Sequence, residues 1–186
     1  ESGIITPDSS SMTWDGTEYA FDEWNSDQDL TTAMQNSVNW YFQSLDLQAG
    51  RDTVADFYDS IGYGNRDISG DISSYWMEST LKISPVEQVE LLTELYYNEF
   101  GFSQENTDAV KDSLKLSSGQ TGTLSGKTGT GMVDGKNVNG WFVGYVEQAE
   151  NVYFFAVNIQ GEEGATGSAA SNLALSVLRS YGIWNE

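Results

Sequence analysis

Residues 119–160 read GQTGTLSGKTGTGMVDGKNVNGWFVGYVEQAENVYFFAVNIQ, and this stretch decides the fold class. It is rich in glycine, threonine, β-branched and aromatic residues, which are typical of strands and turns. The pair Asp134-Gly135 indicates a tight hairpin turn. Residues 141–147 and 152–159 are two apolar runs joined by a short polar turn, so they are predicted to pair as antiparallel neighbours.

Helical patterns lie on both sides of this stretch. Before it, apolar residues recur at helical spacing from residue 30 to about residue 48, and a second helix is predicted through Val54 and Ile61, ending at Gly62. After it, a closing helix is predicted from about residue 167 to residue 181. The segment before residue 30 is polar and rich in turns, and its aromatic side chains are expected to pack onto the domain.

A strong helix start precedes the third predicted helix. In Ser84-Pro85-Val86-Glu87, serine can cap the first turn, proline fits the first helical position, and glutamate can reach back to the cap amide. This predicts a helix over residues 85 to about 98, and Ser103 is expected to cap another one through Leu114. Helices followed by a meander of strands and one more helix favour an α+β domain with helices packed on an antiparallel sheet. A length of 186 residues fits one domain, 1–186.

Composition excludes several classes of function. The chain has no cysteine and no histidine, which removes disulfides, thiolate chemistry, the Ser-His-Asp triad and most zinc sites. We expect neither a metal nor another cofactor, so hydrolytic chemistry would rest on serine, lysine, tyrosine or carboxylates. A net charge of −20 opposes nucleic-acid phosphates, and no nucleic-acid partner is expected. No apolar run approaches the ~20 residues of a membrane span, so a membrane would be reached only through segments outside this chain.

The segment Gly126-Lys127-Thr128-Gly129-Thr130-Gly131 carries the strongest chemical signal. Its glycines let a ligand approach a strand edge closely, its lysine supplies a fixed positive charge, and its two threonine hydroxyls can bind a carboxylate. The glycine spacing before the lysine does not fit a phosphate-binding loop. Taken alone, the segment also fits a glycine-rich strand with an exposed lysine.

A second, weaker signal is Ser37-Val38-Asn39, on the first predicted helix or at its bend. Alone it fits ordinary polarity of a helix surface. Together with its neighbours it resembles the class D β-lactamases and the β-lactam sensors of the BlaR/MecR type, and the resemblance covers nearly the whole chain. The elements that carry it, in the family's order, are Trp14-Asp15-Gly16, Trp24-Asn25, SVNWYF at 37–42, Tyr63-Gly64-Asn65, Tyr75-Trp76-Met77, LKISP at 81–85, GKTGTG at 126–131 and NGWFVGYVE at 139–147.

The resemblance implies a serine β-lactamase/transpeptidase-like fold and a Ser-x-x-Lys helix whose serine attacks the β-lactam carbonyl. In the family that helix precedes the Trp14-Asp15-Gly16 element, and only 13 residues precede Trp14 here. We therefore expect an N-terminally truncated domain in which the nucleophile helix and the strands before it are missing, and which is inactive by itself. The exposed sheet edge would favour association.

One stretch inside the chain, Ser79-Thr80-Leu81-Lys82, fits Ser-x-x-Lys letter for letter. It stands where family members carry a similar stretch in addition to their nucleophile, just before the capping box at Ser84. A pattern with two fixed positions also arises easily by chance. Ser79 is therefore not taken as the nucleophile.

The other active-site positions carry over from the resemblance one by one. Ser37 relays a proton towards the β-lactam nitrogen, and Lys127 holds that serine and the negative charge of the ligand. Thr128, Gly129 and Thr130 form the substrate-binding edge, with the hydroxyls near the ligand carboxylate and the Thr130 amide in the oxyanion hole. A further substrate-site residue implied by the resemblance, in a loop that flanks the activating lysine, is Trp76.

Asn39 distinguishes two branches of the family. Class D hydrolases usually have an apolar residue there, which keeps the lysine of Ser-x-x-Lys dry and able to be carboxylated. The sensors have asparagine, which favours the ammonium form of that lysine, so the acyl group persists. A second departure is the lack of arginine or lysine between Ile159 and Leu178, where many class D enzymes place an arginine that binds the substrate carboxylate.

The leading expectation is a penicillin-binding sensor domain, acylated rather than turning over, on the extracellular face of the cell membrane or secreted. It would signal the induction of antibiotic resistance. The alternative is a class D-like β-lactamase that hydrolyses β-lactams. A family member that forms no covalent adduct is a third reading, and a binding module unrelated to β-lactams would leave the ordered motifs unexplained.

Overall fold

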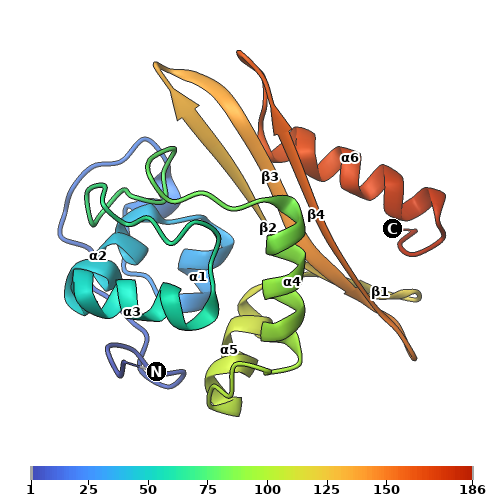
Figure 1. Cartoon of the computed structure of the whole chain (residues 1–186), viewed down its shortest axis with the longest axis horizontal. Helices are drawn as coiled ribbons and strands as arrows, with labels where there is room; N and C mark the ends of the chain where they lie inside the picture. Colours follow the sequence, from blue (N-terminus) through green and yellow to red (C-terminus); the bar gives the residue numbers. More distant parts are fainter. Residues whose placement is uncertain (1, 186) are drawn as a thin grey trace.

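The computed structural model describes residues 2–185 and is built around one antiparallel sheet. Its strands, β1 (Lys115–Gly119), β2 (Gly122–Val133), β3 (Lys136–Glu147) and β4 (Val152–Gln160), lie side by side in chain order. Helix α6 (Gly167–Ser180) lies on one side of the sheet and α4 (Pro85–Tyr96) on the other (Figure 1). The predicted α+β class is confirmed.

Alternation along the strands explains how both faces of the sheet are covered. Phe142 and Val146 on β3 are buried towards α6, where they join clusters that include Ala170 and Leu178. Tyr145 lies between them in sequence and points to the opposite face, with its ring centroid 5.0 Å from that of Tyr96 on α4. Successive side chains of a strand point to opposite faces, and here both faces are apolar.

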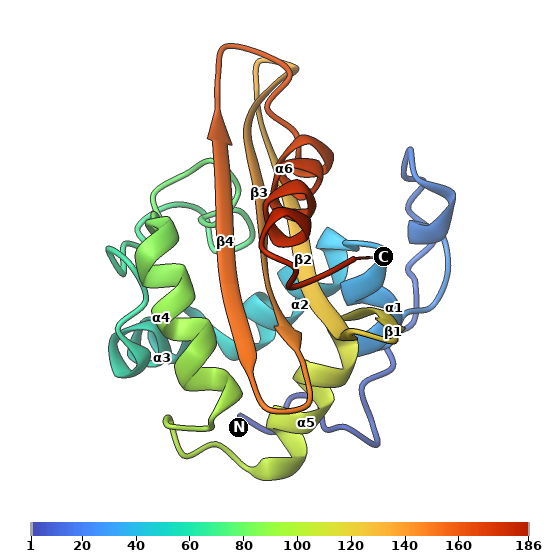
Figure 2. The same cartoon turned by 90° about the vertical axis from the view of Figure 1, so that its right-hand side faces the viewer.

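A helical lobe, residues 2–84, lies beside the sheet (Figures 1 and 2). It contains a short 3-10 helix, η1 (Asp22–Trp24), and the helices α1 (Leu30–Gln35), α2 (Asn39–Ala49) and α3 (Arg51–Ile61). Helix α5 (Gln104–Ser113) packs against α1 and leads directly into β1. The lobe has two apolar clusters of its own, centred on Tyr41 and Tyr75.

The predicted helix starts and the hairpin are confirmed. The Ser84 hydroxyl accepts from the Glu87 amide at 3.2 Å, and the Glu87 carboxylate accepts from the Ser84 amide at 2.8 Å. Ser103 caps α5. Strands β2 and β3 meet at Asp134-Gly135, where both residues have positive φ values of 50° and 75°.

Two predictions about the elements need correction. The continuous helix expected over residues 30–48 is wrong, because α1 ends at Gln35 and α2 begins at Asn39. Strand β1 was not predicted. All five of its residues are exposed, so it lacks the apolar alternation that identifies a half-buried strand.

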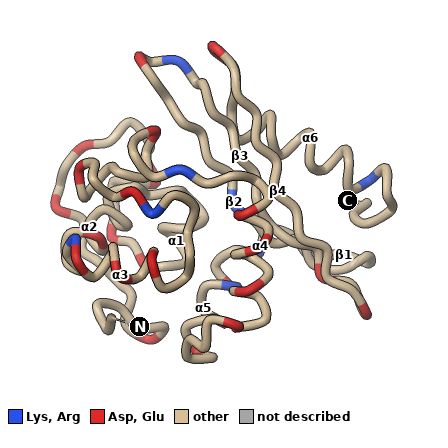
Figure 3. The backbone as a smooth tube through the Cα atoms, in the orientation of Figure 1, with Lys and Arg blue, Asp and Glu red and all other residues tan. Residues whose placement is uncertain are grey.

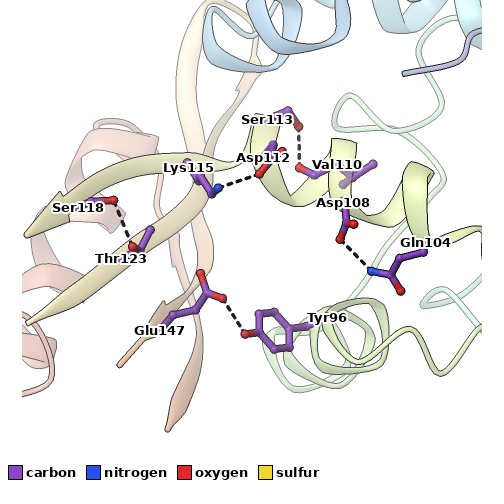
Figure 4. Close-up of polar contacts among 10 residues, drawn as sticks. All are labelled: Tyr96, Gln104, Asp108, Val110, Asp112, Ser113, Lys115, Ser118, Thr123 and Glu147. Carbon is purple, nitrogen blue, oxygen red and sulfur yellow. Dashed lines mark hydrogen bonds and ion pairs between the residues drawn. The ribbon is translucent and has the colours of Figure 1, made fainter. Parts of the chain in front are cut away.

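Polar contacts link α4 and α5 to the strands of the sheet (Figure 4). The Tyr96 hydroxyl donates to the Glu147 carboxylate at 2.7 Å, which joins α4 to the end of β3. Lys115 pairs with Asp112 at 2.7 Å across the junction of α5 and β1. The Lys115–Asp112 pair is exposed and contributes little to stability.

Acidic side chains lie mainly on the helical lobe, on α4 and α5 and at the ends of the strands, α6 carries none, and basic side chains are few (Figure 3). Within residues 2–185, no helix has the length and apolar character needed to cross a bilayer.

Candidate active site

The break between α1 and α2 places Ser37. The Val38 amide donates to the Ala33 carbonyl at 2.9 Å and the Ser37 amide to the Met34 carbonyl at 3.3 Å. This is the Schellman pattern of a helix C-terminus, and Val38 and Ala33 are both fully buried in the same cluster. The motif needs a left-handed residue, and Ser37 has a φ of 54°. The chain therefore turns out of the helix at Ser37, which explains why the continuous helix is wrong.

The left-handed conformation of Ser37 is less favourable for serine than it would be for glycine at the same position. For a residue with a Cβ atom the cost is about 1 kcal/mol. Backbone strain of this kind is found where the surrounding structure fixes a residue for a function. Here it leaves the hydroxyl of Ser37 facing β2.

Lys127 on β2 meets that hydroxyl. Its ammonium donates a hydrogen bond to Ser37 Oγ and another, of 2.8 Å, to the carbonyl oxygen of Thr128. The ion pairs between side chains in the described part of the chain, Arg66–Asp59 and Lys115–Asp112, do not include Lys127. Burial lowers the pKa of Lys127 below its usual value, because the neighbourhood disfavours the charged form. A lysine of this kind exchanges a proton with a neighbouring hydroxyl more readily than an exposed one.

The segment after Lys127 is an open strand edge. Residues 127–131 pair with β3 on one side, whereas β1 pairs with β2 only over residues 122–125. Thr128, Gly129 and Thr130 are exposed. The backbone groups on the open side are therefore available to an extended ligand, which can bind as an additional strand.

The first turn of α6 is seated against this edge. The Gly167 amide donates to the Thr130 hydroxyl oxygen at 2.9 Å. Because that oxygen already accepts a bond, the hydroxyl proton of Thr130 remains to be donated to an anion. A Cβ atom at Gly167 would lie 2.9 Å from the Gly129 carbonyl oxygen, so the contact needs glycine.

Asn39, the first residue of α2, lies on the lobe side of the site. Its amide nitrogen is 3.4 Å from the sulfur of Met77, a weak acceptor. The neighbouring Trp76 donates its indole N–H to Asp46 on α2 at 3.1 Å. Burial raises the pKa of the Asp46 carboxyl. The structure thus joins Asn39 to the loop of Trp76 and Met77, while Trp76 itself is bonded to α2.

A cavity of about 230 Å³ opens beside Lys127. Its lining comes from α1, α5, β1, β2, β3 and α6, and includes Met34, Ser113, Lys127, Phe142 and Ser171. Both Lys127 and Thr128 border this space.

Ser79 does not have the geometry of a Ser-x-x-Lys nucleophile. Residues 79–82 form bends and extended chain rather than a helix, so Ser79 and Lys82 do not share a helical turn. The Ser79 hydroxyl lies against Gly70, and the Lys82 backbone bonds to Asn65. Among residues 2–185, no three histidine, cysteine, aspartate or glutamate side chains gather in a way that could hold a metal ion.

Sequence reasoning missed the contacts that Met77, Glu78 and Gly167 make at this site. The sequence placed Gly167 only at the start of the closing helix, within the stretch that lacks arginine and lysine. Glu78 is one of 28 acidic residues and has no distinguishing neighbour in the sequence. Its positive φ of 45° is a sign of special placement that only the structure reveals.

Comparison with known proteins identifies relatives along the whole chain. A family model described as the penicillin-binding protein transpeptidase domain matches residues 1–179. The "Regulatory protein BlaR1" of Bacillus licheniformis is 53% identical over 184 residues, covering 99% of this chain and 30% of the relative. The chain thus spans about 30% of the length of that relative.

Solved structures show the same similarity. The C-terminal domain of the Bacillus licheniformis BlaR penicillin-receptor superposes with a TM-score of 0.94 at 52% identity, covering 99% of this chain and 74% of the other. A class D β-lactamase, YbXI from Nostoc, superposes with a TM-score of 0.92 at 36% identity, covering 99% and 77%. The backbone is shared with both, and the sequence is nearer to the BlaR domain.

Proposed function

Because this chain belongs to the penicillin-binding protein transpeptidase-domain family, we propose that it is the β-lactam-binding part of a BlaR/MecR-type sensor that is acylated by the drug and signals resistance induction. The observation that carries the proposal is the hydrogen bond from Lys127 to Ser37 beside the open edge of β2. The difference between 52% identity to the BlaR domain and 36% to the class D enzyme favours the sensor.

The acylated serine would come from a Ser-x-x-Lys helix outside residues 1–186. Its hydroxyl attacks the β-lactam carbonyl carbon, and its proton passes to the lysine of the same motif. As the carbon–nitrogen bond breaks, Ser37 gives its proton to the β-lactam nitrogen. Lys127 returns a proton to Ser37 through the bond that the structure contains.

The strand edge would hold the drug during this reaction. The Thr130 amide would donate to the developing oxyanion, which is stabilised most when donors are already in place. The Thr130 hydroxyl accepts a hydrogen bond from the Gly167 amide and would donate its own proton to the drug carboxylate. Thr128 and Lys127 lie next to it on the same strand, so carboxylate binding would rest on these groups in place of an arginine.

Asn39 supports a long-lived acyl adduct. Among the described residues, its amide is bonded only to the thioether of Met77, at 3.4 Å, so it can turn to a stronger partner. We propose that this partner is the lysine of Ser-x-x-Lys. The amide would stabilise the ammonium form of that lysine and so remove the base that deacylation needs.

Placement in the cell follows from the same proposal. A domain that meets β-lactams before the cytoplasm does would lie on the extracellular face of the membrane, held there by segments outside this chain, or be secreted. We also propose that residues 1–186 form a single domain. On its own this domain would associate through β4, which has no second strand partner among the described residues, and through the exposed apolar residues of α6.

Mass spectrometry of the intact protein tests the proposal. Residues 1–186 and a longer chain that includes the upstream Ser-x-x-Lys helix are each incubated with benzylpenicillin. A stable adduct on the longer chain alone is expected for the sensor. Rapid loss of the adduct with drug hydrolysis would instead support the second candidate, a class D-like β-lactamase. The observation that favours this candidate is the TM-score of 0.92 to a class D enzyme.

A mass shift on residues 1–186 by themselves would mean that the nucleophile lies within this chain, with Ser79 again a candidate. No adduct on either chain would contradict acylation altogether. It would leave a family member that folds without reacting.

A further inference from the structure

Among residues 2–185, two side-chain hydrogen bonds join the helical lobe to the sheet, one at each end of the open edge of β2. At the start of the edge, Lys127 donates to Ser37. At its end, Asn139 donates its amide to the Glu78 carboxylate at 2.7 Å. Asn139 lies directly across from Gly131 in the β2–β3 register, so the second bond sits one residue beyond Thr130.

The space for the Glu78 carboxylate exists because residue 131 is glycine. A Cβ atom built on Gly131 would overlap the carboxylate of Glu78. The space that a side chain at Gly131, the last glycine of the GKTGTG segment, would fill is therefore occupied by the side chain of Glu78 from the lobe.

The sheet side of this contact is held by further amides. The side-chain oxygen of Asn139 accepts from the side-chain amide of Asn158 at 2.6 Å, and the side-chain oxygen of Asn158 accepts from the side-chain amide of Gln160 at 3.0 Å. These bonds fix which atom of Asn139 faces the lobe. With its oxygen bonded to Asn158, Asn139 presents N–H donors to Glu78, which as a carboxylate only accepts.

The lobe side of the contact is strained and continues into the site. Glu78 has a φ of 45°, which is costly for a residue with a side chain. The residue before it, Met77, lies 3.4 Å from the Asn39 amide, and Trp76 is bonded to Asp46 at 3.1 Å. One turn of chain thus connects the end of the ligand edge to Asn39.

We propose that Glu78 is a positioning residue that closes the helical lobe onto the sheet at the Gly131 end of the edge, and so holds Met77 and Asn39 against the ligand site. It acts through Asn139 and does not touch the ligand. The proposal rests on the proposed function for its effect on acylation. The closure itself is a property of the fold that can be measured without a drug.

A donor–acceptor swap tests the closure in the longer chain that includes the upstream helix. Glu78→Gln keeps an acceptor for Asn139 but loses the carboxylate charge, so it should weaken the contact less than Asn139→Asp does. Asn139→Asp keeps the acceptor for Asn158 but sets two carboxylates against each other. In the double variant Glu78→Gln with Asn139→Asp, the glutamine donates to the aspartate, so the contact returns with its roles exchanged.

Two readouts are taken on each variant. Hydrogen exchange of the peptide covering residues 63–84 reports closure. The rate constant of acylation by benzylpenicillin, separated from its binding constant, reports positioning. For Asn139→Asp we expect exchange at least about tenfold faster and acylation about tenfold slower, because a hydrogen bond to a charged group is lost. The double variant should recover most of both.

A further variant keeps both Glu78 and Asn139 but fills the space beside Gly131 that the Glu78 carboxylate occupies. Gly131→Ala displaces the Glu78 carboxylate and should reproduce the faster exchange. Unchanged exchange in both Asn139→Asp and Gly131→Ala, or a double variant no better than Asn139→Asp, would overturn the proposal. If the unchanged longer chain forms no adduct, the proposed function fails, while the exchange results still decide whether Glu78 closes the lobe.

Discussion

Ser37 and Lys127 are 90 residues apart in the sequence, and the ammonium of Lys127 donates a hydrogen bond to the hydroxyl of Ser37. Ser37 belongs to the turn that ends α1, and Lys127 belongs to the middle of β2. The pair exists only when the helical lobe is packed on the sheet. Proton transfer between these side chains is therefore coupled to the folding of the whole domain.

The strain at Ser37 separates stability from reactivity. Ser37→Gly should be more stable than Ser37→Ala by about 1 kcal/mol, because both lose the hydroxyl but only glycine adopts the left-handed conformation without the cost of a Cβ atom. The control Ser37→Ala keeps the strain and loses the same hydroxyl. In the longer chain both variants should acylate about 100-fold more slowly, as expected when a proton relay is removed. Thermal unfolding and stopped-flow acylation measure the two effects. Equal stability of the two variants would contradict the strain.

Lys127 should make stability depend on alkaline pH. Its pKa is lowered in the fold, so between the folded value and the ordinary value of 10.5 the unfolded chain binds more protons. The contribution of this group to the free energy of unfolding therefore rises with pH over that window. Below the folded pKa, Lys127 is charged in both states, and the full destabilisation by the buried ammonium applies. Lys127→Met should stabilise the domain most at neutral pH, with a smaller gain at pH 10. Urea unfolding at the two pH values gives the comparison, and a gain that grows with pH would contradict the buried charge.

Gly167 should be intolerant of even one methyl group. In Gly167→Ala the Cβ atom would lie 2.9 Å from the Gly129 carbonyl oxygen and from Thr128 Cβ, so α6 or the strand edge must move. We expect a loss of about 1–3 kcal/mol in stability and slower acylation of the longer chain. Gly161→Ala is the control, because its Cβ atom would be 3.5 Å from the nearest atom. Similar behaviour of the two variants would show that the helix is not seated as described.

Association of residues 1–186 should depend on the outer face of α6. Leu173, Val177 and Tyr181 are exposed there at four-residue intervals, with Tyr181 77% exposed. Leu173→Lys with Val177→Lys should shift the chain towards monomer in light scattering at micromolar concentration. Asn172→Lys with Ser176→Lys adds the same charge beside the stripe and serves as the control. If the control disperses the chain equally well, charge rather than apolar contact governs association.

The fold could be predicted from the sequence wherever local and tertiary preferences agree. The capping box at Ser84 and the turn at Asp134-Gly135 are local signals, and both elements formed as expected. The break at Ser37 could not be predicted, because the apolar spacing continues through Val38. The chain leaves the helix so that Val38 can join Ala33 in the core. Strand β1 is polar and exposed, and it pairs only because β2 is beside it.

The candidate site was predicted from resemblance more than from physical pattern. Spacing alone could not bring Ser37 to Lys127, since nothing local links α1 to β2. The structure brings Ser37, Lys127, Thr128 and Thr130 together, and their roles in acylation remain predictions. Glu78 was out of reach, because its placement depends on a positive φ and on a glycine 53 residues later in the chain.

For the proposed binding of β-lactams, the distribution of charge has a consequence for the rate of association. The body carries a net charge of −20, and the cation at the strand edge, Lys127, is half-buried. An anionic drug must therefore approach against the field of the whole protein and feels the lysine only at short range. Added salt shortens the reach of that field, with a Debye length of about 10 Å at 0.1 M. Under the proposed function, added salt should therefore speed the encounter between this domain and an anionic β-lactam.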